Sequence, residues 1–434
     1  IVGLDGATWD VIFPMIEDGK LPNLKYLLQG GMWGYLNSTN PPMTLPSWSS
    51  MLTGCNPGKH GIFDFVQKRE SDWELEFTNS TFRCVPTIHQ ILSKQDARVV
   101  SIAVPTTWPP QEINGVIISG FDSPVSTGID RSFCKPNDLY DELQRKFGGM
   151  CFADFQESNI DQDWHQNAKK SLLQEVKRKS NIAKWLLKKE RWDTFMFLFG
   201  ESDTVSHHFW RFYDQKSPRF DGSSKELSSA IPDVYIALDR MLGEVIESAN
   251  ADHICLCSDH GFGGAGIHAV YLNRFLESRG WLKYKKRTVF SPILDSSKIL
   301  FAKYMPSSLQ GRIYRNLPQR FINKLESSSR FGDINFTNTK AISDEMNYAA
   351  TLRLNMSDEE LSTNMLDSLM IDLLEWKVDG GRVVKKIYRR EDIYWGDALS
   401  RSPELILELE EREGYTYTLL PSNRSKKMWR VLQK

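Results

Sequence analysis

Seven residues of types that bind metals or attack phosphorus come just after predicted strands or at the start of a predicted helix. Aspartate and histidine form the oxygen and nitrogen ligand set that suits Zn²⁺ and related divalent ions. Such a set can hold two ions ~4 Å apart, an arrangement that supports phosphoryl transfer. A threonine hydroxyl beside such an ion is a usable nucleophile. The seven residues are Asp5, Thr44, Asp203, His207, Asp259, His260 and His268.

Thr44 lies in a stretch with clear start and stop signals for a helix. Pro46 suits the first turn of a helix, the pattern 47–53 predicts a short helix, and Gly54 closes it. A hydroxyl at this place meets unpaired backbone N–H groups and the positive end of the helix dipole, which favours phosphate binding. Taken alone, Thr44 is more commonly an N-cap residue. The aspartates and histidines elsewhere in the chain favour the chemical role.

Short apolar segments separated by helical patterns must position these residues. The alternation predicts an α/β fold, with a mostly parallel central sheet covered by helices on both faces. Ligands bind at the carboxyl edge of such sheets, where we expect all seven residues. The predicted strands are 1–4, 33–38, 99–104, 115–120, 194–199 and 254–257, with a hairpin at 63–66 and 73–77 and later strands at 383–388 and 404–409.

The composition changes after residue 280. Residues 281–338 are rich in Lys, Arg and Ser and show no sheet pattern, so we expect an inserted lid or cap. Residues 1–280 and 339–434 are expected to form one catalytic domain around it. The basic run 283–287 is more often a solvated face than a nucleic-acid site.

Charge and hydropathy exclude several classes of protein. The net charge of −1 offers no field for nucleic acid, so no nucleic-acid partner is expected. No apolar run is long enough for a transmembrane helix. Six cysteines without a CxxC pair indicate a reducing compartment, and we expect a cytoplasmic protein. Cys255 and Cys257 lie in an apolar run and are expected to pack in the core.

The ordered motifs resemble those of the alkaline phosphatase superfamily. The closest resemblance is to the microbial type I phosphodiesterase/nucleotide pyrophosphatase family, and it is strong over residues 1–280. The matching segments are Asp5, MTLPSWSSMLTG around Thr44, PGKHGIFDF, VPTTWPP, GVIISGFDSP, GESDTVSH, SDHG and the Ile-His pair ending at His268.

This resemblance implies roles for single residues. Thr44 resembles the nucleophile that forms a phospho-threonine intermediate, and the Leu45 backbone N–H would bind a non-bridging oxygen. One ion would be held by Asp5, Thr44, Asp259 and His260. The other would be held by Asp203, His207 and His268. The resemblance implies two divalent ions, zinc or alternatively manganese, and a small phosphate-ester substrate.

The sequence also departs from this family pattern. Nucleotide-cleaving relatives carry a phosphate-binding Asn where this chain has Phe65, and no Arg lies near Thr44 in the sequence. A doubly charged monoester needs more cationic partners than a diester, so these gaps favour a phosphodiester. A phosphomonoesterase and a phospho-group transferase stay open as alternatives. A non-catalytic binding protein is disfavoured because all seven positions are filled.

Overall fold

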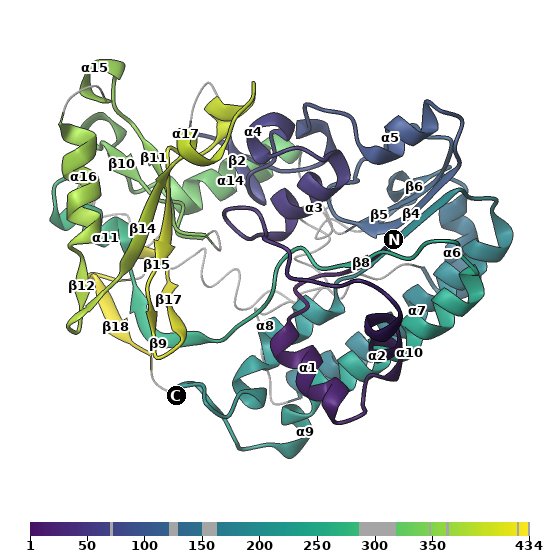
Figure 1. Ribbon diagram of the computed structural model, residues 1–434. Coiled ribbons are helices and arrows are strands. Elements are labelled where there is room, and N and C mark those ends of the chain that lie inside the picture. The colour runs from purple at the N-terminus through teal and green to yellow at the C-terminus, as the bar shows by residue number, and fades with distance from the viewer. Residues whose placement is uncertain are drawn as a thin grey trace. The chain divides into compact units, whose positions relative to one another are not determined.

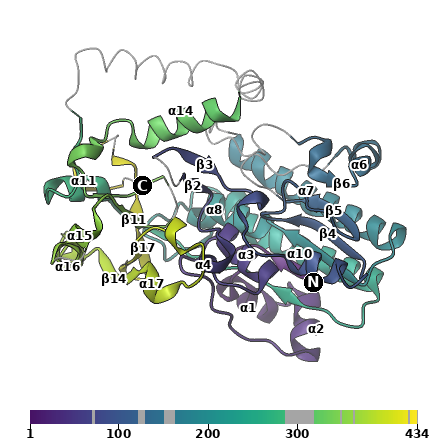
Figure 2. The same ribbon diagram turned by 90° about the horizontal axis from the view of Figure 1, so that it is seen from above.

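The computed structural model describes residues 1–69, 73–120, 129–149, 163–285, 318–346, 349–361, 364–422 and 425–432. These residues form two compact units. Unit 1 comprises residues 1–62, 78–216 and 220–263, and unit 2 comprises residues 63–77, 217–219 and 264–434. Figures 1 and 2 show the elements of both units from two directions.

Unit 1 is built on a six-stranded sheet with the order β6-β5-β4-β7-β1-β8. All neighbouring strands are parallel except β6, which runs antiparallel to β5. The predicted mostly parallel α/β sheet is therefore confirmed. The strands are β1 (Val2–Leu4), β4 (Val99–Val104), β5 (Gly115–Ser119), β6 (Cys134–Lys135), β7 (Thr194–Phe199) and β8 (Leu256–Cys257).

Alternate side chains of β7 enter two separate cores. Phe195, Phe197 and Phe199 pack in the larger core, while Met196 and Leu198 pack on the other face with Trp48. A strand buried on both faces needs a continuous apolar sequence, which explains the run TFMFLF. The larger core is formed with α1 (Trp9–Glu17), α2 (Pro22–Gly30), α6 (Leu139–Phe147), α7 (Trp164–Lys189), α8 (Glu201–Tyr213) and α10 (Ala230–Ala249), and the other face carries α3 (Thr44–Thr53) and α5 (Ile88–Ser93).

Three sequence expectations about unit 1 are wrong. Residues 33–38 form no strand, because no described strand pairs with them, and Trp33 and Tyr35 are exposed. The strand at 254–257 is shorter than expected and lies at the sheet edge rather than the centre. Cys255 is consequently exposed and not a core residue, whereas Cys257 is half-buried.

Unit 2 contains two four-stranded sheets, with orders β10-β11-β15-β14 and β16-β17-β9-β18. The predicted strands at 383–388 and 404–409 are β14 (Val384–Arg389) and β15 (Leu405–Leu409); they pair with each other and not with the sheet of unit 1. The other strands are β9 (Ala265–Val270), β10 (Ala341–Ile342), β11 (Thr351–Leu354), β16 (Glu411–Arg412), β17 (Tyr415–Leu419) and β18 (Trp429–Val431).

Helices and a hairpin complete unit 2. The predicted hairpin is present as β2 (Val66–Lys68) and β3 (Leu75–Phe77), which pair antiparallel. Three helices, α11 (Leu272–Ser278), α14 (Gln319–Phe331) and α16 (Met365–Leu374), pack in the same apolar core as β14 and β15. The predicted domain boundaries stay a prediction. The lid at 281–338 stays a prediction, because residues 286–317 lie outside the described residues.

No helix in the described ranges is both long and apolar enough to cross a membrane.

Candidate phosphoryl-transfer site

Asp5 lies at the centre of the polar residues in unit 1. It follows β1 directly, and its side chain is fully buried. The turn after it requires Gly6, which has a positive φ of 61°. A Cβ atom on Gly6 would lie 2.7 Å from the Asp203 Oδ1 atom, so only glycine allows Asp203 to come this close.

Thr44 is the first residue of α3, and the N-cap position belongs to Met43. Thr44 is therefore not the N-cap residue of α3. Its hydroxyl lies 3.4 Å from Asp5 Oδ1 and 3.3 Å from His260 Nε2. The next residue, Leu45, is in the first helical turn, where the backbone N–H has no intrahelical acceptor. An anion beside Thr44 would meet this N–H and the positive end of the helix dipole.

His260 presents one particular nitrogen to this group. Its Nδ1 lies 2.8 Å from the Gly261 carbonyl oxygen, which can only accept, so Nδ1 carries the proton. The lone pair of Nε2 is then directed to Thr44 and to the carboxylates of Asp5 and Asp259, at 3.7 and 3.3 Å. A backbone carbonyl that fixes the tautomer in this way is a common feature of histidines that bind metals.

The helix α8 carries Asp203 and His207 one turn apart. Asp203 Oδ1 and His207 Nε2 are 3.4 Å apart. The ring of Phe262 lies across the His207 ring, with centroids 4.8 Å apart at an angle of 87°. The start of α8 is fixed by Ser202, whose hydroxyl donates to the Asp5 carbonyl oxygen at 2.6 Å. Residues four apart lie on the same face of a helix, which explains why these two side chains meet.

Three carboxylates are gathered here, and no lysine or arginine in the described part of the chain pairs with them. Burial and the nearby Asp259 and Asp203 carboxylates raise the pKa of Asp5 well above its usual range. Burial raises the pKa of Asp259 to about 6. Asp203 Oδ1 and Asp259 Oδ2 are buried and accept no hydrogen bond from the described residues. Buried, unsatisfied acidic oxygens are costly, and a divalent cation would satisfy them.

The donor set fits a metal ion. Asp5, Asp203 and His260 each offer a ligand atom, and these atoms all lie within 4.8 Å of one another. The cluster draws on both of the ligand sets expected from the sequence, since Asp203 was expected at the second ion. Imidazole nitrogen and carboxylate oxygen are ligands that zinc and manganese accept. The two ligand sets stay a prediction.

The sequence placed His268 just after the end of a strand, but the structure does not. It lies within β9, in unit 2. Its Nε2 lies 3.4 Å from Asp379 Oδ2 and 3.2 Å from the Arg412 guanidinium. The expectation that all seven residues share one sheet edge is therefore wrong for His268, because β9 belongs to a different sheet.

With this geometry described, similarity to known proteins can be stated. The sequence model of the type I phosphodiesterase/nucleotide pyrophosphatase family matches residues 1–427. The chain belongs to this family. Family membership makes it a phosphoric ester hydrolase, of a kind that is typically metal-dependent. No curated protein sequence matches the chain significantly.

Solved structures with low sequence identity are similar to this chain, and the first of them shares its fold. Phosphonoacetate hydrolase from Sinorhizobium meliloti 1021, in complex with phosphonoformate, has a TM-score of 0.52 at 16% identity, covering 96% of this chain and 84% of that chain. Murine ectonucleotide pyrophosphatase/phosphodiesterase 5 has a TM-score of 0.47 at 12% identity, covering 99% and 82%.

The structure adds a site residue that sequence reasoning missed. Trp48 is one turn after Thr44 on α3, and its indole N–H donates to Asp5 Oδ2 at 2.9 Å. The spacing of four residues in TLPSW was the available signal, since it places Trp48 and Thr44 on one helical face. Trp48 also packs over Gly3, where a Cβ would lie 2.6 Å from the indole ring. Trp48 therefore orients the Asp5 carboxylate, which approaches the Thr44 hydroxyl.

Trp48→Phe should weaken metal binding while leaving the fold intact. Phenylalanine keeps most of the apolar burial but donates no hydrogen bond, so Asp5 loses the partner that fixes its orientation. Loss of such an outer contact typically costs about 10-fold to 100-fold in metal affinity. Zinc titration by calorimetry measures the effect, and an unchanged Kd would show that Trp48 does not orient Asp5. Trp185→Phe is the matched control, since Trp185 lies on α7 and its ring contacts Phe147 of α6 rather than Asp5.

The buried residue His60 contacts the later part of α3, the helix that begins at Thr44. The Ile62 N–H donates to His60 Nδ1 at 3.1 Å, so Nε2 carries the proton and donates to the Ser50 hydroxyl at 3.0 Å. His60 is therefore neutral and cannot act as a base toward Ser50. Burial, with a smaller effect of the Arg83 charge, lowers the pKa of His60 to about 3.

His60→Gln should reduce the loss of stability in acid. In the wild type the unfolded chain takes up a proton near the ordinary histidine pKa of about 6.5, while folded His60 does so only near 3. The free energy of unfolding must then fall between these values as the pH decreases, by up to about 1.4 kcal/mol per pH unit for this one proton. Urea unfolding between these pH values should give a shallower slope for the variant. An unchanged slope would contradict the assignment; the exposed His253→Gln serves as the control.

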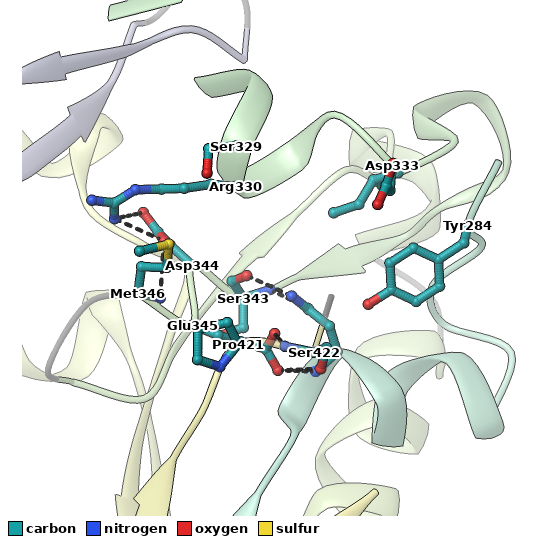
Figure 3. Close-up of a pocket in the computed structure, with 12 residues that line it drawn as sticks. Tyr284, Ser329, Arg330, Asp333, Ser343, Asp344, Glu345, Met346, Pro421 and Ser422 are labelled. Atoms are coloured by element: carbon teal, nitrogen blue, oxygen red, sulfur yellow. Dashed lines mark hydrogen bonds and ion pairs between the residues drawn. The ribbon is translucent and has the colours of Figure 1, made fainter. Parts of the chain in front are cut away.

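A second buried polar cluster lies wholly in unit 2 (Figure 3). Arg330 pairs with Asp344 at 2.9 Å, and Glu345 accepts from the Ser422 N–H and hydroxyl. Burial raises the pKa of Glu345 to about 6. The adjoining cavity of about 20 Å³ has room for a single water molecule. These groups satisfy one another, so this cluster joins chain segments and is not a second candidate active site.

Proposed function

We propose that the chain is a metal-dependent phosphodiesterase in which Thr44 is the nucleophile. The observation that carries the proposal is the convergence of the Thr44 hydroxyl, Asp5 and His260 at the start of α3. A hydroxyl at this position is held by a carboxylate and an imidazole, and a phosphate beside it would meet the Leu45 N–H. The proposed ligand sets are Asp5, Thr44, Asp259 and His260 for one ion, and Asp203, His207 and His268 for the other.

The proposed reaction proceeds in two displacements at phosphorus. Thr44 Oγ1 attacks phosphorus, the alcohol leaves, and a phospho-threonine forms; water then cleaves this ester and restores the hydroxyl. Asp5 and His260 orient the hydroxyl and accept its hydrogen bond or proton, and Leu45 N–H steadies a non-bridging oxygen. Bound divalent ions, which we propose to be zinc with manganese as the alternative, would supply positive charge for the attacking and leaving oxygens.

The surroundings of Thr44 favour a diester over a monoester. Within the described ranges, no lysine or arginine forms a hydrogen bond or ion pair with Thr44, Asp5 or Asp203. A monoester dianion places two charged oxygens at such a site and needs more cationic partners than a diester anion does. The alternatives are a phosphomonoesterase and a transferase that passes the phosphoryl group to another acceptor. We also propose a reducing, cytoplasmic setting, because the six cysteines include no CxxC pair.

A substrate panel on zinc-loaded protein tests this proposal. We expect bis-p-nitrophenyl phosphate and the p-nitrophenyl ester of thymidine monophosphate to be cleaved with a higher kcat/KM than p-nitrophenyl phosphate. Preference for p-nitrophenyl phosphate would overturn the diesterase assignment. Transfer of phosphate to added glycerol, in excess of transfer to water, would favour the transferase instead.

A further inference from the structure

The strand β18 is the last strand of its sheet in unit 2, and no other described strand pairs with its outer edge. It pairs with β9 on one side and ends the order β16-β17-β9-β18, as Figure 1 also shows. Hydrogen bonds from Tyr271 N–H to the Met428 carbonyl and from Leu432 N–H to the Ile267 carbonyl define the register. In an antiparallel pair only alternate residues bond to the neighbouring strand. The backbone groups of Trp429 and Val431 therefore point away from β9.

A groove of about 840 Å³ runs beside this strand. One wall is the strand and the residues before it, and the other is one face of α11. This volume is in the range of pockets that hold ligands. The lining residues are Arg274, Glu277, Ser278 and the run Lys426 to Val431.

The groove combines positive charge with exposed apolar surface. Lys426, Lys427 and Arg430 are exposed and, among the described residues, pair with no carboxylate. The one acid in the lining, Glu277, is already paired with Arg274 at 2.7 Å. Met428 and Val431 are 39% and 49% exposed. The groove thus offers cations, apolar contacts and free backbone groups in one place.

We propose that this groove binds an extended acidic segment of a partner protein, which adds a strand to β18. Peptides that add to an open sheet edge gain affinity from backbone hydrogen bonds and specificity from alternate side chains. Acidic side chains of the segment would face Lys426, Lys427 and Arg430, and its apolar side chains would contact Met428 and Val431.

Charge decides against two other occupants of the same edge. A second copy of this chain would bring three cations against three, which opposes pairing of two β18 strands. A charged edge strand can also serve only to prevent aggregation. Protection against aggregation would not require the groove between β18 and α11 that is present here. The family match ends at residue 427, so most of the strand wall lies beyond it.

Peptide binding to the full chain tests the proposal. The probe is a fluorescein-labelled peptide of alternating glutamate and valine. We expect saturable binding that weakens with added salt, because screening reduces attraction between exposed charges. Hydrogen exchange of the Trp429 and Val431 amides should slow on binding. The double variant Lys427→Glu, Arg430→Glu should weaken binding on the order of 100-fold, about tenfold for each reversed charge.

Two controls separate strand addition from simple attraction of charge. The exposed Lys377→Glu variant, in unit 2 outside the groove, should bind the peptide as the wild type does. A peptide with proline in place of its central valines has the same charge but lacks N–H donors, so it should bind much more weakly. Equal binding of both peptides, no peptide binding at all, or binding only to phosphatidylglycerol vesicles through Lys427 and Arg430 would each overturn the proposal.

Discussion

Replacing Thr44 with alanine should reduce hydrolysis of bis-p-nitrophenyl phosphate on the order of 10⁴-fold, the loss typical of a missing nucleophile. Bound zinc should stay near the wild-type level, because Asp5, Asp203 and His260 are unchanged and hold their ligand atoms within 4.8 Å of one another. The phosphorylated threonine that mass spectrometry should detect in acid-quenched wild-type protein should be absent. Steady-state kinetics and elemental analysis together measure both effects.

A matched variant on the same helix controls for damage to α3. Thr53 is the last residue of α3, at the opposite end of the helix from Thr44, and its hydroxyl donates to the Ser49 carbonyl at 2.7 Å. Thr53→Ala should keep its activity within a few-fold of the wild type. Thr44→Ser should retain measurable turnover, because serine keeps the hydroxyl. Activity close to wild type in Thr44→Ala would sink the nucleophile assignment.

Asp5→Asn should abolish the stabilisation of the protein by zinc. A ligand that binds only the folded state adds about 2.7 kcal/mol to the free energy of unfolding when present at about 100 times its Kd. Asparagine removes the charge of the carboxylate that lies between Thr44, His260 and Trp48. The Tm of the wild type should therefore rise on adding zinc, and the Tm of the variant should not.

Without metal, the Tm of Asp5→Asn should not fall below the Tm of the wild type. Burial and the carboxylates of Asp259 and Asp203 oppose ionisation of Asp5, so without metal the charge of Asp5 destabilises the fold at neutral pH. Metal-free Asp5→Asn should then have a Tm at least as high as the metal-free wild type. Asp239→Asn is the control: this buried carboxylate accepts from the Leu24 N–H at 2.7 Å, so its loss should lower Tm with or without zinc while the zinc effect persists. A full zinc effect in Asp5→Asn would remove Asp5 from the ligand set.

The amino-acid sequence alone determined the class of fold and the family, and it supplied the candidate residues of the site. The run TFMFLF predicted a strand buried on both faces, which β7 confirms, and the strand–helix alternation predicted the mostly parallel sheet. Placement after strand ends brought Asp5 and Asp259 together, since β1 and β8 are parallel neighbours and their carboxyl ends meet at one edge. These features follow from local pattern and from the geometry of parallel sheets.

Only the tertiary structure decided the rest, because long-range contacts set it. The contact between Thr44 and His260 joins residues 216 positions apart, and the role of Trp48 depends on a residue 43 positions earlier. The apolar pattern at 254–257 suggested a central strand, but strand order places β8 at the edge. Trp33 and Tyr35 alternate as strand residues do, yet a strand needs a hydrogen-bonded neighbour, and none of the described strands pairs with them. The place of His268 within β9, in another sheet, likewise follows from pairing that no local pattern encodes.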